Sequence, residues 1–154
     1  MAEIFTFAEI EVEFIERAHT MVWCNCATVD AQNRPRSRVL HPIWAGATGW
    51  VLTGRNSPKA KHLERNRFVS LAYLADPLKP VYAECEAMWE EDSTTRRRIS
   101  ELFKNTPPPL GYDPALFLWN AENPESGLLR LQPWRIELAD LFNPQSVKTW
   151  RPAG

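Results

Sequence analysis

Residues 49–73 read GWVLTGRNSPKAKHLERNRFVSLAY, and their periodicity changes twice. The runs Trp50–Thr53 and Phe68–Leu74 are rich in β-branched and aromatic residues, which is typical of strands. Between them, Ser57 suits a helix N-cap and Pro58 suits the first helical position. The stretch therefore predicts a strand, a helix and a second strand, with basic side chains gathered at the helix start.

The same signals place further elements on both sides of this stretch. A capping box begins at Thr6, and apolar residues then recur at helical spacing as far as Ala18. Pro42 lacks a backbone donor and is expected at an edge or a bulge, and the last strand is expected to be interrupted near Pro133. The predicted elements are helices at 7–18, 58–66 and 93–104 and strands at 21–29, 36–44, 50–53, 68–74, 81–89 and 128–138.

Hairpin-connected strands with helices between and around them predict a mainly β (α+β) fold, a small antiparallel β-barrel with peripheral helices. No Gly-x-Gly-x-x-Gly follows a strand, so nothing supports a parallel dinucleotide-binding sheet. The 154 residues are about one domain's length, and we expect residues 1–154 to form a single domain.

The charge balance limits the classes of partner. The formal net charge is -1, so no field of the whole protein attracts nucleic acid or an anionic membrane. The run Arg96–Arg98 is typical of a solvated helix face rather than of a nucleic-acid site. The N-terminus lacks a basic segment followed by an apolar run, and no apolar stretch is long enough to cross a bilayer. These features predict a cytoplasmic protein with no nucleic-acid or membrane partner.

The cysteines favour neither a disulfide nor a metal site. Cys24 and Cys26 are too close in sequence for easy disulfide geometry, and Cys85 stands alone. No second paired spacing completes a zinc shell. We interpret all three as reduced thiols at buried positions and predict no metal.

The helix start that follows residue 56 is a candidate anion site. A helix N-terminus presents unpaired N–H groups and a partial positive charge, both of which suit phosphate. Ser57 can donate its hydroxyl, Lys59 adds a charge in the first turn, and Arg55 can reach in from the loop. A plain helix start with solvated lysines explains this segment equally well. Arg38, on the preceding hairpin strand, favours the anion site because its guanidinium can meet the same phosphate from the other side.

Three segments carry a family resemblance: ATVDAQNRPRSRVLHPIW (27–44), GWVLTGRNSPKAKHLERNRFVSLAY (49–73) and LLRLQPWRIEL (128–138). Together they resemble the pyridoxamine 5'-phosphate oxidase-like, flavin-binding split β-barrel superfamily, over roughly residues 21–138. The paired signals are an arginine on the second strand and Thr-x-x-x-Ser-x-Lys after the third. The resemblance implies a split antiparallel β-barrel that forms a homodimer. It also implies flavin mononucleotide (FMN), or in some branches the deazaflavin F420, in a groove at the subunit interface.

The resemblance implies a role for each matched position. Arg38 and Lys59 bind the phosphate with Ser57, the backbones of residues 39–41 run along the ring edge, and Thr53 contacts the ring or the ribityl chain. Trp119 or Trp134 is a candidate wall or lid over the ring. The longer, charged tail of F420 would use additional cations. The complete set of expected cofactor-binding residues is Arg38, Val39, Leu40, His41, Thr53, Arg55, Ser57, Pro58, Lys59, Lys61 and Trp119.

The activity implied is that of an FMN-binding oxidoreductase, with hydride transfer to or from a small organic substrate. An F420-dependent reductase is one alternative, and a non-enzymatic flavin- or haem-binding protein is another. His41 is a candidate proton donor, although a strand histidine bonded to backbone explains it as well. True pyridoxamine phosphate oxidases follow the last matched strand with a segment rich in Arg and His and a further strand. Here Ala139–Pro144 follows instead, so that oxidase activity is not expected.

Overall fold

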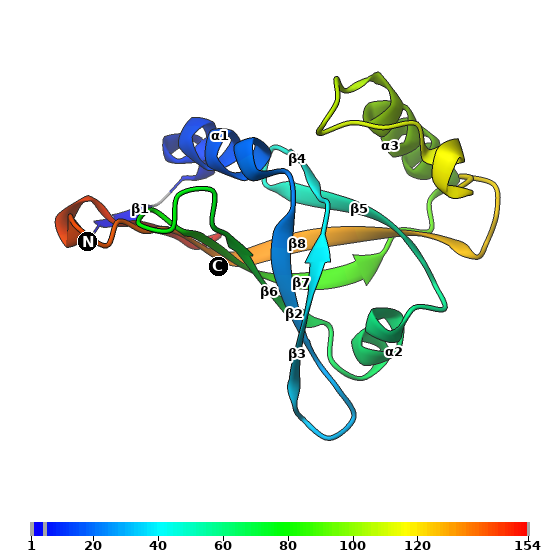
Figure 1. The fold of residues 1–154 in the computed structure, drawn as a ribbon, viewed down its shortest axis with the longest axis horizontal. Coiled ribbons are helices and arrows are strands. Elements are labelled where there is room, and N and C mark those ends of the chain that lie inside the picture. Colours follow the sequence, from blue (N-terminus) through cyan, green and yellow to red (C-terminus); the bar gives the residue numbers. More distant parts are fainter. Residues whose placement is uncertain (1, 5, 154) are drawn as a thin grey trace.

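The computed structural model describes residues 2–4 and 6–153, which form one strongly curved mixed sheet with helices around it (Figure 1). The strands within these ranges are β1 (Ala2–Ile4), β2 (Cys24–Val29), β3 (Pro35–Leu40), β4 (Ile43–Ala45), β5 (Thr48–Gly54), β6 (Phe68–Tyr73), β7 (Val81–Trp89), β8 (Ser126–Leu138) and β9 (Lys148–Trp150). The helices are α1 (Glu11–Met21), α2 (Pro58–Arg65) and α3 (Ser93–Asn105), with short 3-10 turns at Phe7–Glu9, Pro114–Phe117 (η2) and Pro144–Ser146.

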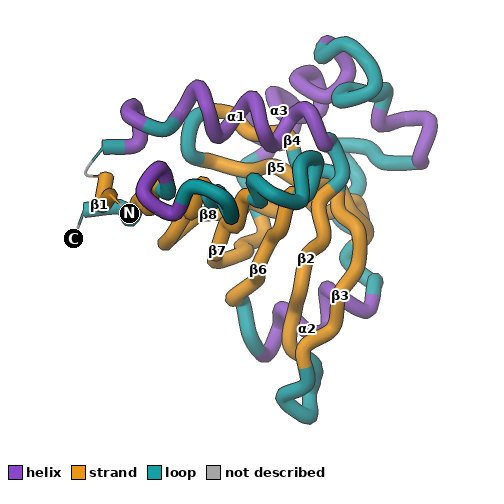
Figure 2. The backbone as a smooth tube through the Cα atoms, turned by 60° about the vertical axis from the view of Figure 1, so that its left-hand side comes forward, coloured by secondary structure: helices purple, strands orange, loops and turns teal. Residues whose placement is uncertain are grey.

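The sheet has the order β1-β9-β8-β7-β6-β2-β3, and its long strand β8 organises it. β7 pairs along one side of β8, while β5 and β9 pair with different halves of its other side. These pairs are antiparallel, and β1 joins β9 in parallel. Figure 2 shows the strands fanning out from β8 to β3, with α1 running across one end and α2 beside the β2–β3 hairpin. The predicted mainly β fold is confirmed.

Three details differ from the sequence prediction, and a fourth agrees with it. The predicted strand 36–44 is wrong as one element, because Pro42 cannot donate to a ladder and the chain divides there into β3 and β4. The first helix begins with a 3-10 turn and becomes α-helical only at Glu11. β1 and β9 were not predicted, and β9 is a further strand after β8 where none was expected. The interruption near Pro133 is confirmed as a register shift, in which Cys85 faces Pro133 and Glu84 faces Arg135.

The apolar side chains form two buried clusters. The larger one lies inside the curved sheet and includes all three cysteines, which are free thiols as predicted. The second lies under α3 and contains Trp50 and Trp119. None of the helices within residues 2–4 and 6–153 is both long and apolar enough to span a membrane.

Helix α2 follows directly from its sequence. Ser57 is the N-cap, and its Oγ accepts a hydrogen bond from the Ala60 N–H at 3.3 Å, while Pro58 takes the first helical position. Ala60 is buried, and the helix packs against β2. This placement sets the first turn of α2 over the β2–β3 hairpin.

Candidate anion and cofactor site

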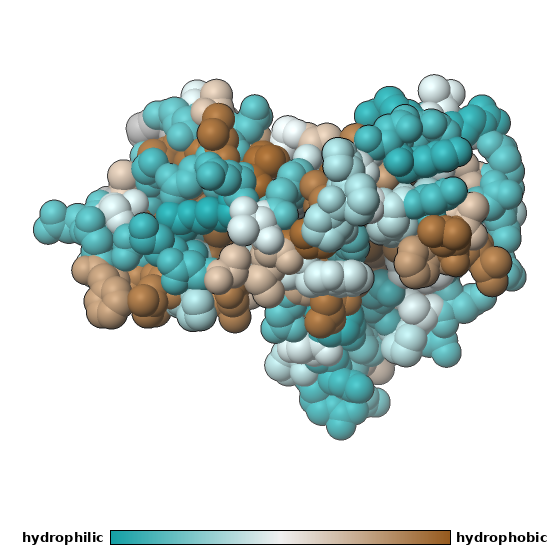
Figure 3. Space-filling model, turned by 45° about the horizontal axis from the view of Figure 1, so that its top comes forward, coloured by the Kyte–Doolittle hydropathy of each residue, from teal (hydrophilic) through white to brown (hydrophobic). Residues whose placement is uncertain are grey.

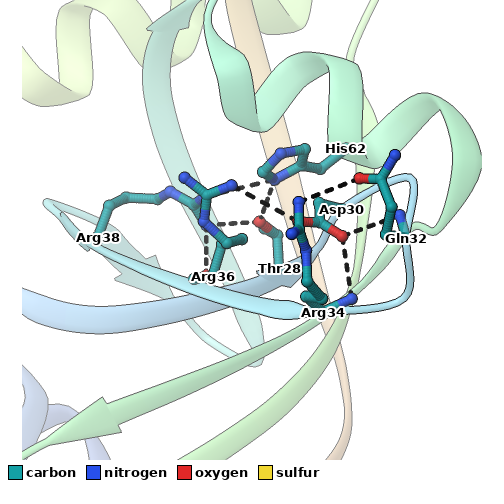
Figure 4. A network of polar contacts seen from close by, with 7 residues as sticks. All are labelled: Thr28, Asp30, Gln32, Arg34, Arg36, Arg38 and His62. Carbon is teal, nitrogen blue, oxygen red and sulfur yellow. Dashed lines mark hydrogen bonds and ion pairs between the residues drawn. The ribbon is translucent and has the colours of Figure 1, made fainter.

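Arg38 reaches from β3 toward α2. It lies opposite Cys26 in the antiparallel β2–β3 register, and opposite residues share a face of the sheet. Because Cys26 is buried, the Arg38 side chain points to the inner side of the hairpin. Its Nη1 donates to Thr28 Oγ1 at 2.6 Å and to the Arg36 carbonyl at 3.0 Å, and its Nη2 lies 3.4 Å from Nδ1 of His62 (Figure 4).

Lys59 approaches the same place from the first turn of α2. Its Nζ donates to Ser57 Oγ at 3.3 Å. Burial lowers the pKa of Lys59, and the positive charge of Arg38 lowers it further. The second effect shows that the two cations are close enough to repel each other.

The pKa of the Cys26 thiol also indicates that Arg38 and Lys59 lie close together. Burial raises the pKa of Cys26 to about 11, and the charges of Arg38 and Lys59 oppose that rise. Arg38 from β3 and Lys59 from α2 therefore share one neighbourhood, with Ser57 at its rim.

This pair of cations has no counter-charge in the described part of the chain. Within residues 2–4 and 6–153, neither Arg38 nor Lys59 forms an ion pair. On the same hairpin, Arg34 and Arg36 both pair with Asp30, at 2.9 and 3.5 Å. Half-buried like charges without a counter-ion destabilise a fold, and an anion between them would remove the repulsion.

The other predicted cations do not join this pair. Arg55 forms an ion pair with Glu91 and lies over the Trp89 ring, 4.8 Å from its centroid. Lys61 is exposed on the outer side of α2. Arg55 also lines a depression of about 300 Å³ together with Thr53, Ser57 and other residues. The site thus has a cationic centre at Arg38 and Lys59 and a shallow neighbouring depression at the loop before α2.

The residues that follow Arg38 separate to different surroundings. Val39 is exposed, whereas Leu40 is buried in the larger core cluster. His41 Nε2 bonds to the Leu110 carbonyl, and the ring contacts Trp23 and Tyr112 edge to face at centroid distances of 4.6 and 5.1 Å. Burial lowers the pKa of His41, which favours the neutral ring that donates from Nε2. This contact supports the interpretation of His41 as a histidine bonded to the backbone.

Trp119 lies at the edge of the depression beside α2, which it lines together with Thr53 and Ser57. It is buried in the cluster under α3, and its Nε1 donates to the Gly127 carbonyl at 2.8 Å. This bond fixes the indole inside the domain, and a wall or lid formed by Trp119 stays a prediction. Trp134 is 44% exposed, since the register shift in β8 leaves it outside the ladder.

Two residues at the site were missed from the sequence. Thr28 and His62 touch each other, with 2.7 Å between Thr28 Oγ1 and His62 Nδ1, and both touch Arg38. Both had a signal. Thr28 lies two residues after Cys26 and hence on the same face of the strand, and His62 lies three residues after Lys59 and hence on the same side of the helix.

A second cavity, of about 720 Å³, lies between α1, the β6–β7 turn and the segment after β8. None of the predicted site residues lines it. Of its three basic side chains, Arg17 and Lys148 pair with Glu13, and the third is Lys79. Among the residues that the structure describes, no group of three or more His, Cys, Asp or Glu is placed to hold a metal ion.

Solved structures share this architecture. A pyridoxamine 5'-phosphate oxidase-related, FMN-binding protein of Nostoc punctiforme matches with a TM-score of 0.67 at 12% identity, covering 98% of both chains. A Clostridium acetobutylicum protein of the pyridoxine phosphate oxidase family, related to general stress protein 26, gives 0.68 at 12% identity, over 93% of this chain and 94% of that one. The chain has the split-barrel fold.

Not all structures with this fold are described as flavin proteins. The haem storage protein HutZ of Vibrio cholerae matches with a TM-score of 0.59 at 22% identity, over 80% of this chain and 89% of that one. No protein-family model matches the sequence, and no curated protein does. The similarity therefore shows the fold, which haem-binding and FMN-binding proteins share.

Proposed function

We propose that this chain binds FMN and acts as an oxidoreductase on a small organic substrate. The observation that carries the proposal is the pair Arg38 and Lys59, two adjacent half-buried cations at the first turn of α2 with no counter-ion among the described residues. Flavin nucleotides end in a phosphate dianion, which matches this pair in charge and in its need for several donors.

The residues present fit the phosphate end of the cofactor. Arg38 offers a planar guanidinium, Lys59 a movable ammonium and Ser57 a hydroxyl at the helix start. A bound flavin would supply the hydride chemistry. The chain's own part is to hold the phosphate, to align the ring along residues 39–41 and beside Thr53, and to exclude water from the ring. His41 is bonded to Leu110, so its role near the ring is orientation through the backbone.

A homodimer belongs to the same proposal. Four aromatic rings contact one another in series from β2 to η2, with Trp23 on His41, His41 on Tyr112 and Tyr112 on Phe117. The two ends of this series, Trp23 and Phe117, are 52% and 69% exposed. Figure 3 shows hydrophobic atoms on the right of the view, at the end of the molecule that holds η2. Such a surface suits a second copy that closes over the ring.

FMN is favoured over F420 by the state of Arg55. The longer, anionic tail of F420 would use cations beyond the phosphate, and Arg55 and Lys61 were the candidates. Arg55 is already paired with Glu91, and Lys61 is exposed. An F420-dependent reductase remains the alternative that the cofactor titration below decides.

A non-enzymatic haem-binding protein is the second candidate, because neighbours with this fold include a haem storage protein. Haem needs an axial ligand, commonly histidine. Nε2 of His19 accepts the Trp44 N–H, and Nε2 of His41 is held by Leu110. Nδ1 of His62, the remaining histidine of the sequence, contacts Thr28 and Arg38 within the proposed anion site, which makes haem the less favoured ligand.

The test is titration of the purified protein with FMN, F420 and haem, followed through tryptophan fluorescence. We expect FMN to bind most tightly, and Arg38→Ala and Lys59→Ala to abolish that binding. Arg36→Ala is the matched control, because Arg36 lies on the same strand but is paired with Asp30. Equal loss in the control, or tighter binding of haem than FMN, contradicts the proposal. Reduction of bound FMN by NADH or NADPH, followed by reoxidation by an acceptor, separates an enzyme from a carrier.

A further inference from the structure

Thr28, Arg38 and His62 form a chain of polar contacts beneath α2, drawn from three different elements (Figure 4). Arg38 Nη1 lies 2.6 Å from Thr28 Oγ1, and Thr28 Oγ1 lies 2.7 Å from His62 Nδ1. Arg38 Nη2 approaches the same Nδ1 at 3.4 Å. The imidazole thus contacts one of the two cations of the anion site and lies one helical turn from the other.

Both neighbours of Nδ1 are able to donate to it. Arginine can only donate, so Thr28 Oγ1 accepts from Arg38, and the threonine hydroxyl hydrogen is then free to point at His62. Nδ1 also faces an N–H of Arg38. When Nδ1 carries no proton, its lone pair can accept from both neighbours, and the imidazole then holds Arg38.

No negative charge is placed to favour a second proton on the ring. Arg38 from β3 faces His62 directly, Lys59 stands three residues earlier on α2, and Cys26 from β2 lies beneath both cations. Asp30, at the end of the hairpin, is occupied by Arg34 and Arg36. No carboxylate within residues 2–4 and 6–153 contacts His62. A proton added at Nδ1 would turn an N–H toward the Arg38 guanidinium and place a third cation beside two others.

A bound dianion reverses that balance. With a phosphate or sulfate between Arg38 and Lys59, a third positive charge attracts the anion, and Arg38 turns toward the anion instead of toward Nδ1. We propose that His62 is a third, proton-dependent member of the anion site, so that an anion and a proton bind together. This rests on the proposed function, because it needs the anion site at Arg38 and Lys59.

The test uses sulfate, which stays a dianion where histidine titrates, between about pH 5.5 and 8. Affinity is measured by isothermal titration calorimetry across that range. We expect sulfate affinity to rise about tenfold as the pH falls, which corresponds to a coupling of about one pH unit. His62→Asn keeps an acceptor in place of Nδ1 but cannot take a proton, so it should bind sulfate as the wild type does at high pH and show no pH dependence. His19→Gln, which keeps the acceptor for Trp44 elsewhere in the domain, should retain the wild-type dependence.

The imidazole itself gives a second reading that needs no variant. In the NMR titration of wild-type protein, the His62 midpoint should move to higher pH when sulfate is added, while those of the other histidines stay in place. A pH-dependent affinity that persists in His62→Asn, or a His62 midpoint that ignores sulfate, overturns the inference and leaves the proposed function intact. Failure of the wild type to bind sulfate, phosphate or FMN overturns both.

Discussion

Arg96 of α3 is buried and Arg38 of β3 is half-buried, both without a carboxylate partner among residues 2–4 and 6–153, and they have opposite roles. Arg96 is 5% exposed, and its Nε and Nη2 donate to the carbonyls of Ala121, Asn123 and Ser126 at 3.0, 3.1 and 2.6 Å. Its guanidinium also lies over the Trp119 ring, 5.3 Å from the centroid. Arg96 holds the loop between η2 and β8 onto α3.

Arg38 differs from Arg96 in having a second cation beside it. It also donates to carbonyls, those of Cys26 at 3.4 Å and Arg36 at 3.0 Å, but its shortest bond is to the Thr28 hydroxyl, and Lys59 repels it. A buried arginine without an acid is therefore not enough to indicate a ligand site. The informative feature is a second cation beside it, because two neighbouring positive charges repel each other until an anion lies between them.

The largest effect expected from this comparison is at Arg96. Arg96→Met should lower the free energy of unfolding by about 3 kcal/mol, because three carbonyls, that of Ser126 fully buried, lose a charged donor. Urea unfolding followed by tryptophan fluorescence measures this. Arg97→Met is the matched control on the next position, since Arg97 forms an exposed pair with Glu122 at 2.6 Å and should cost at most about 0.5 kcal/mol. If the two substitutions lowered the free energy of unfolding equally, Arg96 would not hold the loop between η2 and β8 in place.

The same substitution at Arg38 should change stability little and FMN affinity strongly. Arg38→Met is expected to change the free energy of unfolding by less than about 1 kcal/mol, because it removes repulsion as well as hydrogen bonds. FMN affinity should fall about 100-fold, since a charge-assisted contact to phosphate is lost. Fluorescence titration and urea unfolding of one preparation give both quantities. A large loss of stability with unchanged FMN affinity would mean that Arg38, like Arg96, has a structural role only.

The three-arginine run shows how far sequence reasoning reached. The solvated helix face expected for Arg96–Arg98 is wrong for Arg96. Its spacing from Ile99 and Phe103, both buried, places it on the apolar side of α3, and this signal was present in the sequence. An arginine on an apolar stripe usually reaches water by extending its side chain. Here the carbonyls of a distant loop accept from its Nε and Nη2, and no local pattern shows where that loop lies.

The site was predictable to the same extent. The elements that carry Arg38, Ser57 and Lys59 follow from period and capping, and these residues lie where the sequence placed them. The pairing of Arg55 with Glu91 and the burial of Trp119 depend on contacts between segments far apart in the chain. β1 and β9 were missed for the same reason, because two three-residue strands are recognisable only once they pair.

A smaller change, at Trp119, tests how Arg96 holds the loop between η2 and β8 onto α3. Trp119→Phe should lower the free energy of unfolding by about 1–2 kcal/mol, since the Gly127 carbonyl loses its donor and Arg96 loses part of the ring beneath it. Trp134→Phe, at an exposed tryptophan, is the control and should change it by about 0.5 kcal/mol or less. In a double-mutant cycle, Trp119→Phe and Arg96→Met should be less than additive because they share one loop. Full additivity would mean that the two side chains act independently.

Substitution of Lys59 should have the smallest effect on the free energy of unfolding, and it tests the proposed anion site. Lys59→Met should raise the free energy of unfolding of the ligand-free protein by about 1 kcal/mol or less. The substitution removes a half-buried charge that is repelled by Arg38, and water screens this repulsion only in part.

The sign of its pH dependence follows from the lowered pKa of Lys59. The unfolded chain keeps the proton up to about pH 10.4, so the penalty is complete below the folded-state pKa and disappears as the pH rises from there toward that value. The variant should therefore be more stable than the wild type at neutral pH and equal to it at high pH, which urea unfolding at a series of pH values measures. FMN in excess should reverse the order at neutral pH, because only the wild type gains stability from binding. If Lys59→Met is less stable without ligand, the two cations are not in conflict, and the main reason to place an anion between them is gone.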